Sequence, residues 1–331
     1  MNRRQWTVNS GRWTVDGGFP KRKPGSQSFR HAIHNPRFTI HNSPFTIHHP
    51  PSTVHHPPST TPRRGFTLVE LVMSLTLTSI LSVVLGGMIL AAHEGWEHSN
   101  GLSEASQQAR ISQDRITYMV SQAGQYKLPG QPTTLGIAVV EQTYLLVKSP
   151  EILVVWSGGR MGGMAANGVQ SRLPTVNELV IYTPDPSDLT HLIEVIHPTD
   201  TNSVDFRAAN FSTSIQAILK SPACQKTLLC DRVHTSDLSL FGISQTAVSN
   251  IRFEKLDSPT DAELSGIVAG TPAWFNLVWA QGIVSSSTGM RQTTIRMEFQ
   301  VESRPLPRNS SAAVSAIPFF GSASNRYVYQ P

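Results

Sequence analysis

Residues 62–92 read PRRGFTLVELVMSLTLTSILSVVLGGMILAA, and this stretch decides how the chain is organised. Between Phe66 and Ala92 it contains a single charged residue, Glu70. The uncharged run that follows, residues 71–92, is long enough to cross a hydrocarbon core of about 30 Å as a helix. It is longer than the apolar region of an ordinary secretory signal. The sequence therefore predicts a membrane-spanning helix over residues 66–92.

The charges on the two sides of this apolar run differ in sign. Arg63 and Arg64 precede it, whereas Glu94, Glu97 and Glu104 follow it. By the positive-inside rule, the basic end of such a helix stays in the cytoplasm. We therefore expect a single-pass protein of the inner (cytoplasmic) membrane, with a cytoplasmic N-terminus and an extracytoplasmic C-terminal part.

Glu70 is an unusual residue near the start of an apolar helix. An isolated carboxylate in lipid costs several kcal/mol, so it should have a partner or a purpose. Taken alone, Glu70 is explained as an interfacial residue that the dipole of the helix favours at its N-terminus.

Residues 63–71, RRGFTLVEL, closely resemble the class III signal of type IV prepilins and type II secretion pseudopilins. The resemblance implies that a prepilin peptidase cuts between Gly65 and Phe66 and methylates the new N-terminal Phe66. Arg63 and Arg64 then form the basic flank of the leader. Glu70 becomes the fifth mature residue, and its role in that family is to pair with the N-terminal amine of a neighbouring subunit.

The family resemblance also implies a function. It predicts a membrane-anchored, pilin-like minor subunit that assembles through its N-terminal helix into a type II secretion pseudopilus or a type IV pilus. The implied partners are the prepilin peptidase, other pilin-like subunits, an inner-membrane assembly platform and the lipid bilayer; no enzymatic activity and no cofactor are expected. The alternative is a membrane-anchored extracytoplasmic enzyme or binding protein with a chance match to the signal. A simple anchor needs neither the Gly-Phe junction nor Glu70, which favours the first hypothesis.

Residues 1–65 differ in composition from the remainder of the chain. They contain ten basic residues and one acidic residue, whereas residues 66–331 contain 17 basic and 21 acidic ones. A seven-residue repeat from Asn35 to Pro62 carries proline in every unit, which excludes a coiled coil. We predict a low-complexity, disordered leader that is removed or that reflects a mis-annotated start. Its paired histidines lack a prearranged geometry, so no metal site is expected, and without the leader no basic surface for nucleic acid remains.

The sequence beyond residue 92 predicts a soluble domain of the α+β class. Apolar or small residues spaced by three and four positions indicate that the helix continues through residues 93–124. Residues 125–302 form a β-rich domain, residues 205–220 can form a helix within it, and residues 303–331 read as a flexible tail. The predicted strands are 143–147, 152–156, 178–183, 191–197, 248–254, 274–284 and 293–301.

A long N-terminal helix packed on a mainly antiparallel sheet is a pilin-like architecture. The segment ARISQDRITYMVSQAG, residues 109–124, together with the size of the chain, resembles the J-type minor pseudopilins and the W-type minor pilins.

Few side chains of the soluble domain suggest a chemical site. The glycine-rich segment 158–163 lacks the Gly-Lys-Ser/Thr ending of a phosphate loop. Asp257, Asp261 and Glu263 do not have the spacing of an EF-hand and are interpreted as a solvated turn. Cys224 and Cys230 are too few for a four-cysteine zinc site, and in an extracytoplasmic domain we expect them to form a disulfide.

Overall fold

The computed structural model describes residues 6–9, 12–15, 65–240, 244–303 and 316–331. The chain divides into two compact units, Met1–Phe66 and Thr67–Pro331. In the first unit, β1 (Trp6–Asn9) and β2 (Arg12–Val15) pair as a short antiparallel hairpin. The other predictions for the leader, including the basic flank, concern residues outside the described ranges.

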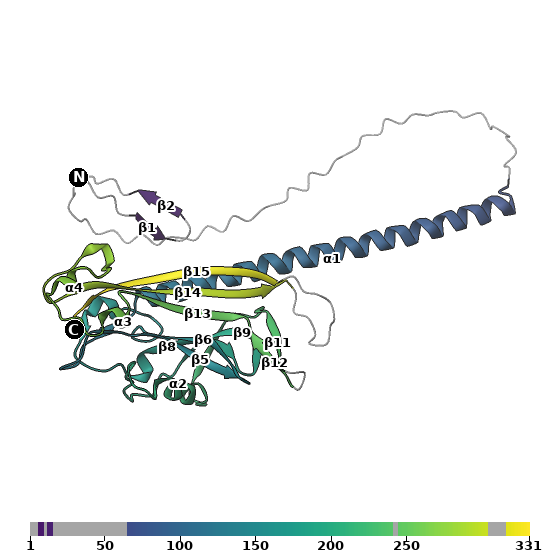
Figure 1. Cartoon of the computed structure of the whole chain (residues 1–331). Helices are drawn as coiled ribbons and strands as arrows, with labels where there is room; N and C mark the ends of the chain where they lie inside the picture. The colour runs from purple at the N-terminus through teal and green to yellow at the C-terminus, as the bar shows by residue number, and fades with distance from the viewer. Residues whose placement is uncertain (1–5, 10–11, 16–64, 241–243, 304–315) are drawn as a thin grey trace, which may run out of the picture. The chain divides into compact units, whose positions relative to one another are not determined.

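The second unit begins with one continuous helix, α1 (Leu68–Ser121), whose 54 residues span about 80 Å. Figure 1 shows its first half extending away from the sheets and its second half lying along β14 and β15. The helix runs without a break through Gly86 and Gly87. Only its second half buries a face, through Gly101, Ala105, Ala109, Ser112, Ile116, Met119 and Val120. A single helix thus joins the predicted segments 66–92 and 93–124.

Two antiparallel sheets form most of the remaining domain. The larger has the order β10-β9-β8-β6-β5, with β5 (Ile137–Tyr144), β6 (Val147–Trp156), β8 (Leu179–Asp185), β9 (Asp188–Ile196) and β10 (Gln225–Cys230). The smaller has the order β13-β14-β15, with β13 (Ile251–Ser258), β14 (Gly289–Glu302) and β15 (Ala316–Tyr329). A hairpin of β11 (Thr235–Leu240) and β12 (Ser244–Ser249) precedes β13.

The remaining elements are short. Strands β3 (Gln125–Tyr126), β4 (Thr134–Leu135) and β7 (Val169–Gln170) form a small mixed sheet. Helix α2 (Phe211–Leu219) lies within the predicted segment 205–220. The other turns of helix are η1 (Met164–Asn167), η2 (Val176–Glu178), α3 (Asp261–Leu264), α4 (Pro272–Phe275) and η3 (Ala280–Gly282).

The core has two layers, one on each face of the larger sheet. The first joins the second half of α1 to the inner faces of both sheets, for example through Ile116, Leu153 and Phe299. The second lies on the opposite face of the larger sheet, where Trp156 and Ile215 of α2 belong to the same cluster. A helix packed on antiparallel sheets confirms the predicted α+β, pilin-like architecture.

The predicted flexible tail at residues 303–331 is wrong for residues 316–331. These residues form β15, which pairs with β14 along its whole length, from Glu302 to Gly289. The strand was hidden because α1 passes close to the middle of its inner face, where Gly321, Ala323 and Asn325 stand in place of large apolar residues. Asn325 is one of them: its Nδ2 donates to the carbonyls of Val120 (2.9 Å) and Ser121 (3.3 Å), at the end of α1.

Two predicted strands are also wrong. Residues 274–284 contain the end of α4, and η3, with turns between and after them. Helix α4 begins here because Thr271 caps its first turn and Pro272 occupies its first position. Residues 143–147 span the tight turn between β5 and β6, where Leu145 has a φ of 55°. The apolar residues of both segments are packed or exposed at turns and do not indicate strand pairing.

The predicted disulfide does not fit this fold, in which Cys224 and Cys230 are free thiols. Strand β10 begins right after Cys224 and ends at Cys230, and a strand advances about 3.3 Å per residue. The two residues are therefore held roughly 15–20 Å apart, whereas a disulfide joins Cα atoms about 6 Å apart. Cys230 belongs to the core beside α1, where burial raises its pKa to about 11.

Candidate functional site

The junction between Gly65 and Phe66 lies outside any helix or strand, directly before α1. The side chain of Phe66 is 85% exposed, and a Cβ atom added to Gly65 would have no neighbour within 4 Å. Nothing in the described residues packs on this peptide bond. A peptidase can therefore reach it without unfolding any part of the soluble domain.

Thr67 and Glu70 close the start of α1 in a reciprocal capping box. The amide of Glu70 donates to Thr67 Oγ1 (3.3 Å), and Glu70 Oε2 accepts from the amide (3.1 Å) and the hydroxyl (3.1 Å) of Thr67. The box satisfies two of the amide groups that every helix start leaves without an internal partner. It also keeps the Glu70 carboxylate beside the N-terminus, one residue from Phe66.

Thr67 was missed when the sequence was interpreted, although its signal was readable. Thr67 and Glu70 have the Ser/Thr-x-x-Glu spacing of a capping box in front of an apolar run. The structure therefore gives Glu70 a local partner in addition to the intersubunit partner that the family resemblance implies.

The membrane-spanning half of α1 contains several hydroxyl side chains that bond to its own backbone. They donate to carbonyls three or four residues earlier at 2.7–2.9 Å, and they are Ser74, Thr76, Thr78, Ser79 and Ser82. Polar groups in lipid must be satisfied within the protein, and these bonds achieve it. This helix is long and apolar enough to cross a membrane.

A second set of contacts fixes α1 to the soluble domain, and we call Gly101, Glu104, Arg232 and Ser303 the collar. Arg232 Nη1 donates to the carbonyls of Gly101 (3.0 Å) and Ser303 (2.9 Å), and its Nη2 pairs with Glu104. Gly101 is required there, because a Cβ atom on it would lie 2.0 Å from the Ser303 carbonyl oxygen. The collar makes the helix and the end of β14 move together.

Further along α1, a buried carboxylate ties the helix to the larger sheet. Glu194 of β9 accepts from Arg115 of α1 (Nε, 2.7 Å), from Arg160 (Nε, 3.1 Å) and from the Tyr182 hydroxyl (3.2 Å). Arg160 belongs to the glycine-rich segment 158–163, so this segment is pinned to the helix and the sheet through Glu194.

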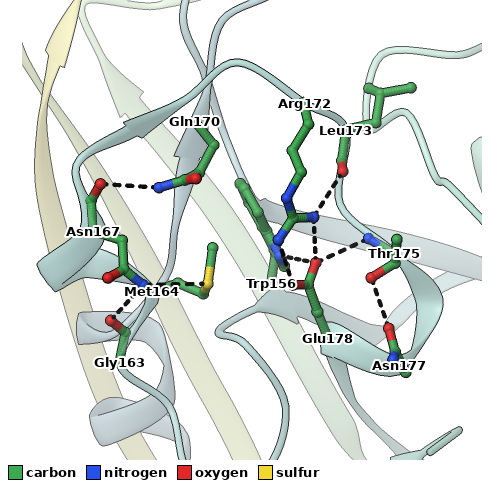
Figure 2. Close-up of polar contacts among 10 residues, drawn as sticks. All are labelled: Trp156, Gly163, Met164, Asn167, Gln170, Arg172, Leu173, Thr175, Asn177 and Glu178. Carbon is green, nitrogen blue, oxygen red and sulfur yellow. Dashed lines mark hydrogen bonds and ion pairs between the residues drawn. The ribbon is translucent and has the colours of Figure 1, made fainter. Parts of the chain in front are cut away.

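The chain beyond the glycine-rich segment is held by a second charged group, which Figure 2 shows. Glu178 accepts hydrogen bonds from Arg172 Nη1 (2.8 Å), Trp156 Nε1 (3.1 Å) and the amide of Thr175 (3.1 Å). The bonds from Arg172 are the main reason that the pKa of Glu178 falls to about 2. Such a carboxylate stays ionised and paired, which suits a structural role rather than proton transfer.

The other side chains singled out in the sequence have structural roles. Asp257 and Asp261 lie 3.4 and 2.8 Å from Nη2 of the buried Arg291, and Glu263 caps α3. Within the described ranges, no three His, Cys, Asp or Glu side chains gather into a group that could hold a metal ion.

Glu151 is a buried carboxyl group that lacks a cationic partner in the contacts described. It lies on β6 with 1% of its surface exposed, accepts a hydrogen bond from the Tyr144 hydroxyl, and its Oε2 has no hydrogen-bond partner. Burial raises its pKa from 4.5 to about 7. The folded protein therefore holds a proton on Glu151 more tightly than the unfolded chain does.

This difference predicts that stability falls as the pH rises. Between pH 4.5 and about 7, the free energy of unfolding should drop by on the order of 3 kcal/mol. In Glu151→Gln, which does not titrate, this part of the profile should be flat. Urea unfolding of both proteins across this range measures the effect, with Glu141→Gln, at the exposed partner of Lys148, as the control. An unchanged slope in Glu151→Gln would disprove the assignment.

Comparisons with known proteins support the prepilin-like signal. Residues 61–86 match the family model described as the prokaryotic N-terminal methylation motif. No curated protein and no solved structure matches the chain. The match covers Gly65, Phe66 and Glu70, and it extends into the apolar half of α1. The chain thus carries a type IV prepilin-like signal on a pilin-like, single-pass, membrane-anchored subunit, and the motif implies a processing peptidase and association with other pilin subunits.

Proposed function

We propose that this protein is a minor subunit of a type II secretion pseudopilus or a type IV pilus, and that it has no catalytic activity of its own. The observation that carries the proposal is the methylation motif at the start of a helix whose apolar half has no buried residue. Before assembly the bilayer covers this half. In a filament, the equivalent helices of neighbouring subunits cover it.

Before assembly, the proposed location of the protein is the inner membrane, with its N-terminus in the cytoplasm. The basic pair Arg63–Arg64 before the helix and the acidic residues after it support this orientation. The size of the chain and the segment 109–124 support a J-type or W-type minor subunit.

Processing creates the charge that Glu70 is proposed to meet. Cleavage after Gly65 converts the amide nitrogen of Phe66 into an amine, and methylation leaves that amine able to carry a positive charge. Two opposite charges inside an apolar helix bundle stabilise assembly only when they meet, since a lone buried charge is costly. The capping box presents the Glu70 carboxylate at the correct end of the helix for this contact.

Glu70→Gln tests this step cleanly, because glutamine also fits the third helical position of a capping box. The start of α1 should therefore keep its structure while the carboxylate charge is lost. Membrane insertion should persist, whereas crosslinking to other pilin-like subunits should fall by two orders of magnitude or more. This loss corresponds to the roughly 3–5 kcal/mol that breaking a buried ion pair costs.

The matched control is Ser74→Ala, one helical turn further along, which removes a hydroxyl that bonds only to its own helix. It should assemble as well as the unaltered protein does. If Glu70→Gln crosslinks as efficiently as Ser74→Ala, then Glu70 caps the helix and has no part in assembly.

A further inference from the structure

A short polar segment of α1 separates the apolar run from the soluble domain. The run ends at Ala92, and the first buried residue of the helix is Gly101 in the collar. Residues 93–100, which we call the spacer, are all exposed and span about 12 Å of helix. The membrane surface must lie somewhere along this spacer if the apolar run lies in lipid.

The spacer contains a large apolar side chain, Trp96, which is 63% exposed. The other tryptophans of the second unit are almost fully buried: Trp156, Trp274 and Trp279 are 0%, 1% and 5% exposed. The Trp96 ring stacks on His93 with centroids 6.4 Å apart, and His93 Nε2 lies 3.1 Å from Glu97 Oε1. The indole thus rests on the His93 side chain of its own helix.

Trp96 lies on the face of α1 that is turned away from the domain. His98 shares a hydrogen bond of 2.9 Å with the Ser303 hydroxyl, so His98 faces the domain. Two residues correspond to about 200° around a helix, which places Trp96 on nearly the opposite side. No part of the soluble domain therefore needs to move for Trp96 to contact another surface.

We propose that Trp96 is an interfacial anchor, whose indole lies in the headgroup layer of the bilayer and sets the height of α1 in the membrane. Tryptophan favours this layer because its ring is apolar while its N–H can bond to carbonyl and phosphate oxygens. Trp96 follows Ala92 by about 6 Å along the axis, the distance expected for a residue just outside the hydrocarbon. This proposal rests on the membrane-anchored function proposed above, and Trp96 lies in the spacer that directly follows the apolar run.

The collar transmits this height to the whole domain. The collar begins at Gly101, only about 8 Å beyond Trp96 along the helix axis. Arg232 bonds there to both α1 and the end of β14. The domain therefore stands at a fixed distance from the membrane surface. The polar residues His93 and Glu94, which precede Trp96, then lie at the level of the headgroups as well.

Depth-dependent fluorescence quenching tests the proposal on the full chain in phosphatidylcholine vesicles. Bromine atoms are placed on the acyl chains either near the glycerol or near the chain ends, and Trp96→Phe is measured beside the unaltered protein. All other tryptophans are common to both proteins, so the difference spectrum belongs to Trp96. We expect this signal to be quenched more by shallow bromine than by deep bromine.

Two position controls in the Trp96→Phe background calibrate the depth. Leu90→Trp, in the apolar run, should be quenched more by deep bromine than Trp96 is. Ile111→Trp, on an exposed site beyond the collar, should not be quenched by either lipid.

If Leu90→Trp is quenched and Trp96 is not, Trp96 faces water or a protein partner and the anchor proposal is wrong, while the membrane helix stands. If deep bromine quenches Trp96 as strongly as it quenches Leu90→Trp, the indole lies within the hydrocarbon, which also overturns the proposed position. If Leu90→Trp itself is not quenched, the membrane-spanning assignment of α1 fails first.

Discussion

Gly65→Val should leave the leader attached to the protein when the chain is co-expressed with a prepilin peptidase. The expected loss of cleavage is about 10- to 200-fold or more, because a site shaped for glycine must accommodate extra methyl groups. The substitution disturbs no contact among the described residues, since a Cβ atom at Gly65 meets none of them within 4 Å. Any loss of processing therefore reports recognition by the peptidase. Intact mass and N-terminal sequencing of the membrane fraction measure the result, with N-methyl-Phe66 as the expected start of the unaltered protein.

Gly86→Ala provides the matched control for this substitution. Gly86 is a second glycine with open space around it, but it lies in the interior of α1. Alanine should be processed normally there and should favour the helix by about 1 kcal/mol. Full cleavage of Gly65→Val would show that the match to the methylation motif does not identify a cutting site.

Gly101→Ala should destabilise the soluble domain strongly, although alanine is the better helix former. The new Cβ atom would lie 2.0 Å from the Ser303 carbonyl oxygen, so α1 and the end of β14 would have to separate. Overpacking of this kind should outweigh the helix propensity and cost at least about 3 kcal/mol. For a domain of this size, that corresponds to a midpoint of thermal unfolding lower by roughly 6–12 °C.

Gly95→Ala isolates the effect of the close contact. Gly95 lies in the same helix, within the spacer, and has nothing within 4 Å of its Cβ position. Its replacement should leave the melting temperature unchanged or raise it. Equal melting temperatures for the two alanine variants would mean that the collar does not hold the helix to the domain.

The membrane half of this protein was predictable because lipid imposes a simple composition on a helix. The apolar length of residues 71–92 and the position of Glu70 required no knowledge of neighbouring strands. The packed half of α1 was also predictable, since residues such as Ala105, Ala109 and Ile116 recur at helical spacing. Both halves of α1 could therefore be predicted from local periodicity and a short motif.

The parts that could not be predicted depend on contacts between distant residues. β15 carries Gly321, Ala323 and Asn325 where a strand usually shows large apolar side chains, because α1 lies against them. Similarly, nothing around Gly101 in the sequence indicates that Arg232 and Ser303 pack on it.

Two other errors had signals that were available. Thr271–Pro272 marks the start of a helical turn in the segment that was predicted as a strand. Cys224 and Cys230 were paired by their closeness in sequence and by the expected compartment, whereas the strand between them decides their separation in space.

The position of β15 has a consequence for the order in which the chain can fold. The residue that follows β15, Gln330, contacts the chain just before β4. There the amide of Thr133 donates to the Gln330 carbonyl (2.8 Å). Contacts between residues so far apart in sequence form late and slowly. The core beside α1 stays open on one side until residues 316–331 have been added, so in the orientation proposed above the domain is still incomplete while the chain crosses the membrane. The segment that completes the surface against which α1 packs is therefore made long after the helix itself.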